Sequence, residues 1–217
     1  MALSDNLPSS ASPRAARSIQ RILDAARRLF GREGYQGASM TEVARAAGVS
    51  KGLLHYHFRS KEHLLIEAQR ATFRQIHRRF EERFQKGDLG METALEALDA
   101  MWEALFDMRK WAPFMVETLS LSAHPGPVRQ HLDEFYAESN AFLERGIHQV
   151  FASDIDTLSI PPDRLARVVR TALHGLVVEM AHARSEADME PIEETYRDLR
   201  DLFSEVALAT PGSEPAA

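Results

Sequence analysis

Side chains that could hydrogen-bond a substrate or a nucleic acid gather in one short stretch, GVSKGLLHYHFRSKEHLL, which covers residues 48–65. An ammonium, two imidazoles and a phenol lie close together there, at Lys51, His55, His57 and Tyr56. Imidazoles and phenols are the usual groups of general acid–base catalysis. The same groups also bind phosphates and base edges in nucleic-acid complexes. The residue types alone therefore leave catalysis, nucleic-acid recognition and plain packing open.

The spacing of these residues gives the stretch two helical faces. Leu54 and Phe58 are four apart and should point together at the core. Lys51 and His55 are also four apart and share another face, next to Gly52. We expect a helix that packs on one side and offers polar groups on the other.

The residues before this helix predict a second short helix and a tight turn. Ser39 and Glu42 form an S-x-x-E capping box, in which each side chain satisfies a free backbone N–H. That helix stops at Gly48, and Ser50 caps the next one, which runs to about Phe58. Two short helices joined by a glycine-containing turn are the helix-turn-helix pattern.

Longer amphipathic helices flank this pair. Ser12-Pro13 predicts the start of the first and Gly34 its end, and Ser60 caps a long basic helix that ends near Lys86-Gly87. The apolar face of the first helix contains Ile19, Ile22, Leu23, Ala26, Leu29 and Phe30, and Arg17, Arg21, Arg27, Arg28 and Arg32 fall elsewhere on it.

The remainder of the chain keeps helical periodicity and shows no sustained alternation. Helices are expected around 95–106, 111–119, 128–151, 164–183 and 191–208, with a loop over 152–160. The helix over 164–183 is apolar nearly all round, which predicts burial on every side. The fold class is all-α, with about nine helices.

Charge divides the chain into two parts. Residues 1–86 hold 16 Lys and Arg against 8 Asp and Glu, a net +8, whereas residues 87–217 hold 10 against 24, a net −14, which together give −6. A basic segment supplies sequence-independent affinity for phosphates. DNA would repel the acidic remainder, so the asymmetry favours a nucleic-acid partner at the N-terminal end.

The amino-acid composition narrows the classes of protein and of functional site that remain. Hydrophobic residues make up 44% and charged residues 27% of the 217, which is typical of a folded globular chain. The absence of cysteine excludes disulfides, thiolate zinc sites and cysteine nucleophiles. No segment is typical of a membrane span or a signal peptide, so we expect a cytoplasmic protein. No metal site or cofactor is expected.

The run from Gly34 to Leu65 resembles the DNA-binding signature of the tetracycline-repressor (TetR) family of transcriptional regulators. The matching features are Gly34-Tyr35, Ala44, Ala47-Gly48-Val49-Ser50, Gly52, His57-Phe58, Ser60-Lys61-Glu62 and Leu64-Leu65. The Ser, Pro and Ala content of residues 1–12 predicts a flexible tail. The resemblance implies a DNA-binding domain over 13–60 and a ligand-binding and dimerisation domain over 61–208. Residues 61–86 would form the connecting helix and 209–217 a second tail.

The interpretation of the DNA contacts combines spacing with the resemblance. Base contacts are expected from the exposed start of the second helix, namely Lys51, Gly52, Leu53 and His55. The resemblance implies phosphate contacts from Ser39, Thr41, Tyr56, His57 and Lys61. Leu53 and His55 depart from the family pattern, so base preference cannot be transferred. Taken singly, Gly52 could serve packing, His57 could be a buried core histidine and Lys51 a solvated charge.

One helix-turn-helix reads only a short half-site, so specificity normally needs two copies. We therefore expect a homodimer on a roughly palindromic double-stranded operator, joined by the last two helices. The expected interface residues are Val168, Ala172, Gly175, Leu176, Leu199, Leu202, Phe203 and Val206. The alternative is that these helices form only the monomer core.

The resemblance also implies a small-molecule pocket in the middle of the chain, whose occupation releases the operator. The expected lining residues are Trp102, Phe106, Trp111, Phe114, Met115, Phe135, Phe142 and His174. They suit an apolar or aromatic effector, and the acidic surroundings favour a neutral or cationic one. The alternative is that this aromatic and methionine stripe is plain core.

Two other function classes were weighed. A di-iron enzyme needs two Glu-x-x-His pairs and two further glutamates, and the chain has a single pair, Glu179 and His182. P-loop, Rossmann, H-E-x-x-H and G-x-S-x-G motifs are missing from the sequence. The second alternative is a helical ligand-binding or partner-binding protein without DNA recognition. A homodimeric repressor remains the favoured interpretation, and enzymatic activity is not expected.

Overall fold

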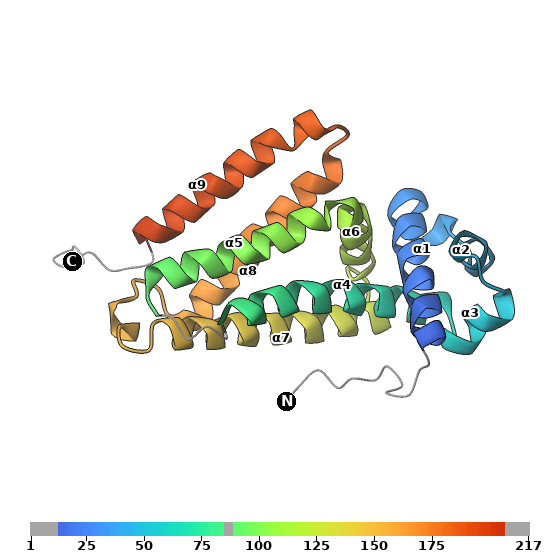
Figure 1. Ribbon diagram of the computed structural model, residues 1–217, viewed down its shortest axis with the longest axis horizontal. Helices are drawn as coiled ribbons and strands as arrows, with labels where there is room; N and C mark the ends of the chain where they lie inside the picture. The colour runs from blue at the N-terminus through green and yellow to red at the C-terminus, as the bar shows by residue number, and fades with distance from the viewer. Residues whose placement is uncertain (1–12, 85–88, 207–217) are drawn as a thin grey trace. The chain divides into compact units, whose positions relative to one another are not determined.

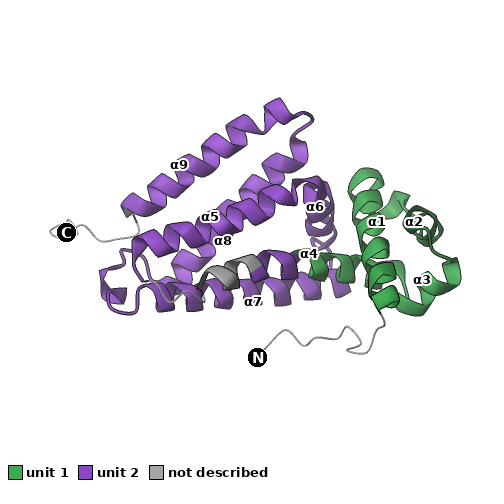
Figure 2. Ribbon diagram, in the orientation of Figure 1, with its two compact units in different colours: residues 1–72 green, residues 73–217 purple. Residues whose placement is uncertain are grey.

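The computed structural model describes residues 13–84 and 89–206, so the tails predicted over 1–12 and 209–217 lie outside the described residues. Within the described ranges the chain forms nine α-helices and three short 3₁₀ helices, and no strand (Figure 1). The chain divides into two compact units, residues 1–72 and 73–217 (Figure 2). The predicted all-α fold class is confirmed.

The first unit consists of three helices and the first half of a fourth. These are α1 (Pro13–Gly37), α2 (Met40–Ala47), α3 (Lys51–His57) and α4 (Lys61–Phe84). The chain leaves helical geometry at Gly34, whose φ of 72° is in the left-handed region that favours glycine. The predicted end of the first helix is thus confirmed, although one further turn continues to Gly37.

Local caps fix α2 and α3. Both hydrogen bonds of the predicted capping box are present between Ser39 and Glu42. Gly48 adopts the left-handed conformation, with φ 63° and ψ 40°, and ends α2. The Ser50 side chain then accepts a hydrogen bond from the backbone N–H of Leu53 and starts α3. The predicted helix-turn-helix is confirmed, together with the residues that begin and end its helices.

The N-terminal half of α4 belongs to the first unit because α1 holds it. Arg27 is only 3% exposed; it pairs with Asp24 at 2.9 Å and donates from Nε to the Ala68 carbonyl at 3.3 Å. The expectation that Arg27 lies on a free basic face is therefore wrong. The compact unit extends to Thr72, twelve residues beyond the predicted end of the DNA-binding domain at 60, and that functional boundary stays a prediction.

The second unit contains the rest of α4 and five further α-helices. These are α5 (Met91–Asp107), α6 (Ala112–Leu121), α7 (Pro127–Val150), α8 (Pro162–His182) and α9 (Glu190–Val206). Short 3₁₀ helices lie at Arg109–Trp111, Ile155–Thr157 and Glu186–Asp188. Helices α6, α7 and α9 all pack against α8, and α9 also contacts α5. The core of this unit therefore lies around α8.

The expected burial of α8 on every side is met only in part within the single chain, and burial of its other side by a second copy stays a prediction. Leu173, Leu176 and Val177 are buried in the core, but Val168 and Gly175 are exposed. The described chain buries α8 on one side only. Some apolar residues of α8 therefore remain uncovered by the neighbouring helices of the same chain.

Candidate nucleic-acid interface and ligand cavity

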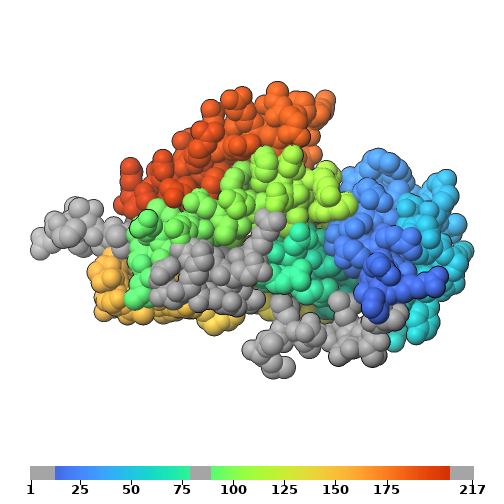
Figure 3. Space-filling view, in the orientation of Figure 1, coloured from blue at the N-terminus to red at the C-terminus, as the bar shows by residue number. Residues whose placement is uncertain are grey.

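Helix α3 has the two faces that the spacing predicts. Leu54 is fully buried and Phe58 is 4% exposed, so they anchor the helix to its unit. The residues predicted to contact bases are all exposed: Lys51, Gly52, Leu53 and His55. Figure 3 shows α2 and α3 at the surface of the first unit. The geometry leaves the predicted base-reading side chains free to enter a groove.

Two apolar or aromatic side chains stand out on this surface. Leu53 is 36% exposed and Tyr56 is 82% exposed, although both belong to a helix with a buried face. The Tyr56 ring leans edge-on against His57, with centroids 5.0 Å apart. Large exposed apolar side chains beside cationic ones are typical of a binding surface.

Gly52 has no structural need to be glycine. A Cβ added there would meet nothing within 4 Å, and its backbone is helical. Glycine in a helix destabilises it by roughly 1 kcal/mol relative to alanine. The absence of a side chain here thus leaves open space in front of the backbone of α3.

The residues predicted to contact phosphate differ in their availability. Thr41 and Tyr56 are exposed, whereas the Ser39 hydroxyl already bonds Glu42 in the capping box. The Lys61 ammonium donates to the carbonyls of Tyr35, at 2.7 Å, and Ala38, at 3.0 Å. Lys61 therefore ties the start of α4 to the last turn of α1 and to the residue that follows it, a role that the sequence did not suggest.

His57 lies between the two faces. It is half-buried, and its Nε2 is shielded from solvent with no hydrogen-bond partner among the described residues. The ring contacts both Tyr56 and Phe58. His57 therefore combines core packing with a ring nitrogen whose bonding capacity is unused within the chain.

In the second unit, a cavity of about 50 Å³ lies between helices α4, α5, α6, α7 and α8. Four residues predicted for a ligand pocket line it, and they are Met115, Phe135, Phe142 and His174. Sequence reasoning missed Phe73, His77, Ser139 and Arg170, which also line it. Phe73 stacks on Phe135 with centroids 3.5 Å apart, so α4 and α7 meet at the cavity wall.

The cavity wall combines neutral imidazoles with one cation. Burial, with the Arg170 guanidinium as the second cause, lowers the pKa of His174 from 6.5 to about 4. Burial likewise lowers the pKa of His77, whose Nε2 lies 3.3 Å from the Ser139 hydroxyl. Both imidazoles are therefore neutral at neutral pH. Arg170 donates from Nε to the Asn140 side-chain oxygen at 2.8 Å.

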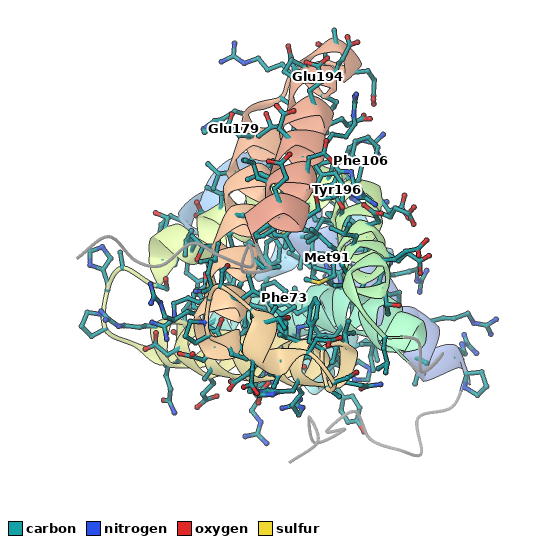
Figure 4. All side chains as sticks on the ribbon, turned by 90° about the vertical axis from the view of Figure 1, so that its left-hand side faces the viewer. Phe73, Met91, Phe106, Glu179, Glu194 and Tyr196 are labelled. Atoms are coloured by element: carbon teal, nitrogen blue, oxygen red, sulfur yellow. The ribbon has the colours of Figure 1, made fainter. Side chains whose placement is uncertain are left out.

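The other four residues predicted for the pocket lie elsewhere. Trp111 and Phe114 are buried in the core, at 6% and 0% exposure. Trp102 stacks on Tyr196 of α9 with ring centroids 4.6 Å apart, and its ring centroid lies 5.7 Å from that of Phe106. Phe106 and Tyr196 lie near each other in Figure 4. These contacts fasten α5 to α9. Trp102 and Phe106 also line a separate pocket with Glu103, Asp107 and Glu193, and the assignment of all four residues as ligand contacts stays a prediction.

The Tyr196 hydroxyl extends the contact between α5 and α9. It donates to Asp99 at 2.6 Å, and Arg200 donates from Nε to the same carboxylate at 2.9 Å. Burial and the hydrogen bond to Asp99 raise the pKa of Tyr196. The tyrosine therefore stays neutral and donating, and its hydrogen bond to Asp99 adds to the stacking on Trp102 in joining α9 to α5.

The residues predicted for a dimer interface fall into two groups. Val168 and Leu202 are 46% and 54% exposed, and Gly175 is also exposed. The others are more covered by their own chain, since Ala172, Leu199 and Phe203 are partly buried and Leu176 is 3% exposed. The side chain of Val206 lies outside the described residues.

Residues 13–84 and 89–206 lack the features of two other classes of protein, metalloenzymes and membrane-spanning proteins. Over these ranges, no group of three or more histidine, aspartate or glutamate side chains could hold a metal ion. The Glu-x-x-His pair of α8 is exposed at both Glu179 and His182. In the same part of the chain, no helix is both long and apolar enough to cross a membrane.

Comparison with known proteins identifies the helix-turn-helix. Residues 22–68 match the family model of bacterial regulatory proteins of the tetR family. The transcriptional regulator AcrR of Shigella flexneri is 43% identical over 53 residues, which are 24% of this chain and 25% of AcrR. The helix-turn-helix domain of this chain belongs to the TetR family. The alignment spans only about a quarter of AcrR, so this match concerns the N-terminal part.

Solved structures are similar to this chain over most of its length. A regulator from Saccharomonospora viridis in complex with choline superposes with a TM-score of 0.72 at 18% identity, covering 90% of this chain and all of that one. FadR of Bacillus subtilis in complex with stearoyl-CoA superposes with a TM-score of 0.69 at 19% identity, covering 83% and 96%. At this identity the likeness concerns fold alone, and it includes the helical second unit.

Proposed function

We propose that this TetR-family chain is a cytoplasmic, homodimeric transcriptional repressor, which a small and largely apolar ligand releases from a roughly palindromic operator. The single observation that carries the proposal is the division of α3. Leu54 and Phe58 are buried, while Lys51, Leu53 and His55 are exposed together on the adjoining surface. A helix held in this way can enter the major groove without unfolding any of its unit.

Within this proposal, the side chains of α3 have separate roles. Lys51 suits a guanine edge or a phosphate, and Leu53 suits the methyl group of thymine. Gly52 lets the backbone approach the DNA closely, because its Cβ position is empty. Tyr56, with Thr41 and the remaining donor capacity of Lys61, contacts the phosphates. His57 and Ser39 are already engaged in packing and capping, so we expect smaller contributions from them.

The test is a fluorescence titration of the full chain with operator DNA, selected from a random pool, at fixed salt. Lys51→Ala and Tyr56→Ala should each weaken binding by about 1–3 kcal/mol at unchanged helicity. Arg70→Ala is the matched control, since it removes one exposed positive charge from α4 instead of α3. Equal losses in Lys51→Ala and Arg70→Ala would reduce the effect of Lys51 to net charge. Absence of salt-dependent DNA binding by the parent chain would instead favour a helical ligand-binding protein.

The proposed dimer rests on the outward side of α8 and α9. Val168 and Leu202 are among the few large hydrophobic side chains that are exposed in the described chain. Gly175 adds a position where a Cβ would meet nothing within 4 Å, which permits close approach of a second helix. Two copies of α8 and α9 would form a four-helix interface that covers these apolar residues.

Sedimentation equilibrium tests the dimer. The parent chain should be a dimer at micromolar concentration, and the double variant Val168→Glu with Leu202→Glu should be a monomer with a normal helical spectrum. Ala137→Glu is the matched control, because it places the same charge on an exposed position of α7. A parent chain that sediments as a monomer would contradict the proposed interface.

The proposed ligand site is the cavity lined by Met115, Phe135, Phe142 and His174. The structures of TetR-like regulators with choline and with stearoyl-CoA support a ligand in this class of protein. The ligand acts by preferring the conformation that fits DNA badly, and its differential affinity sets the size of the release.

A further inference from the structure

We propose that the natural effector is a linear fatty carboxylate, with its acidic head at Arg170 and its chain in a second, wholly apolar cavity of the same unit. This inference rests on the proposed ligand site and specifies its ligand class. It depends on four observations: the position of the second cavity, its lining, the unpaired cation and the length of the combined lining.

The second cavity adjoins the first. Its volume is about 80 Å³. Met101 and Leu143 line both cavities. Those two side chains are therefore the partition between them. A methionine in such a position can repack readily, because its side chain is unbranched and flexible. One extended molecule could thus occupy both cavities with little change in the helices.

The lining of the second cavity contains no polar side chain. It consists of Met91, Ala94, Leu95, Ala97, Leu98, Met101, Leu143, Gly146, Ile147, Val150, Phe151, Leu165, Val169 and Phe203. Phe73 of the first cavity and Met91 of the second both lie among the helices in Figure 4, whereas Glu179 and Glu194 point outward. Such a wall accepts a hydrocarbon chain and disfavours a polar head.

The first cavity supplies a place for the polar head. Arg170 is half-buried, and no carboxylate of the described chain lies within ion-pair distance of it. Its guanidinium uses Nε on Asn140 and lies over the Tyr136 ring, 4.7 Å from the centroid. The two terminal nitrogens have no partner among the described residues. A partly buried cation without a counter-ion favours an anionic ligand, and a guanidinium matches a carboxylate in two-point geometry.

The head and chain positions are far enough apart for a long ligand. Phe135 lines the first cavity and Val150 the second, and they are fifteen residues apart on α7. Fifteen residues of α-helix extend over about 22 Å. A short acid would reach only the first cavity, whereas a dodecanoate could cross the partition at Met101. The earlier expectation of a neutral or cationic effector is thus opposed by the charge of the lining.

Calorimetric titration of the full chain, without DNA and below the critical micelle concentration, tests this inference. The ligands are octanoate, decanoate, dodecanoate and dodecanol. Each added pair of methylenes should tighten binding by up to about tenfold. Dodecanoate should bind at least about tenfold more tightly than dodecanol, because only the carboxylate forms a charged, two-point pair with the guanidinium.

Two variants separate the head from the chain. Arg170→Gln should remove the preference for dodecanoate over dodecanol, while Arg167→Gln, which removes an exposed charge from the same helix, should keep it. Ala94→Phe fills the second cavity and should abolish the gain from octanoate to dodecanoate without affecting octanoate. Unchanged octanoate binding by Ala94→Phe and dodecanol binding by Arg170→Gln would demonstrate that both variants fold.

Equal affinity of the parent chain for octanoate and dodecanoate would overturn the chain site, and equal affinity for dodecanoate and dodecanol would overturn the head site. Because no DNA is present, these outcomes are independent of DNA binding. Operator binding that dodecanoate does not weaken would instead contradict the proposed release mechanism, even if the calorimetric results hold.

Discussion

The two units of this chain differ in where their candidate functional side chains lie. In the first unit, serine side chains cap α2, α3 and α4 locally, and the candidate recognition residues point outward. In the second unit, α5, α6, α7 and α8 begin without a side-chain cap, and the candidate ligand residues point inward. In the first unit, residues close together in the sequence thus stabilise the helices that carry the exposed candidate residues. In the second unit, helices far apart in the sequence pack together and enclose the candidate ligand residues.

This difference predicts how tolerant each unit is to change. Residues of α3 that face outward can vary without loss of stability, so DNA specificity can change independently of folding. Residues of the cavity both bind the ligand and pack the helices together, so a change in ligand specificity also changes stability. The following experiments test this separation, in order of decreasing effect.

The largest effect is expected from neighbouring leucines of α3. Leu54→Ala should lower the free energy of unfolding by about 2–5 kcal/mol, because it leaves a cavity at a fully buried position. Leu53→Ala, one residue earlier and 36% exposed, should change it by less than about 0.5 kcal/mol while weakening DNA binding. Urea denaturation measures both. Similar losses of stability would contradict the separation of packing and recognition within α3.

The next effect is a pH dependence located in the second unit. The pKa of His174 falls from 6.5 to about 4 on folding, so the unfolded state binds more protons between those pH values. Stability should therefore decline as the pH falls from 6.5 towards 4, by up to about 3 kcal/mol for this residue. His77 contributes in the same direction.

Denaturation at a series of pH values tests this assignment. His174→Gln should flatten the decline, whereas His55→Gln, at an exposed position of α3, should leave it unchanged. An undiminished decline in His174→Gln would show that the acid sensitivity arises from other groups.

The smallest of these effects concerns the local caps. Ser39→Ala removes both hydrogen bonds of the Ser39 hydroxyl to Glu42, although the backbone N–H of residue 39 can still donate to the Glu42 carboxylate, and it should destabilise the chain by about 1 kcal/mol. Thr41→Ala, two residues later and exposed, is the matched control and should have little effect on stability. Thermal denaturation of the two variants makes the comparison. An unaltered midpoint for Ser39→Ala would mean that tertiary packing alone holds α2.

Sequence reasoning succeeded where the deciding groups lie within one or two helical turns. The capping box, the end of α2 at Gly48 and the two faces of α3 all depend on such short spacings. It failed for Arg27, because burial of that arginine depends on the Ala68 carbonyl of another helix.

The cavity was only partly predictable for the same reason. Met115 and Phe135 line it as expected, but Trp102 lies elsewhere because Tyr196 of α9 stacks on it. Arg170 and His77 were missed because isolated charged or polar residues in amphipathic helices are usually solvated. Only the packing of α4, α7 and α8 against one another turns these two residues towards a cavity.

The empty Cβ position at Gly52 has a consequence for directed evolution. Alanine fits there without a clash and favours helix, so Gly52→Ala should raise the unfolding free energy by roughly 0.5–1 kcal/mol. A selection for thermal resistance alone would therefore enrich this substitution, whereas a selection for regulation in living cells would remove it. Sequencing codon 52 in both populations would reveal whether thermal stability and regulation select different residues at this position.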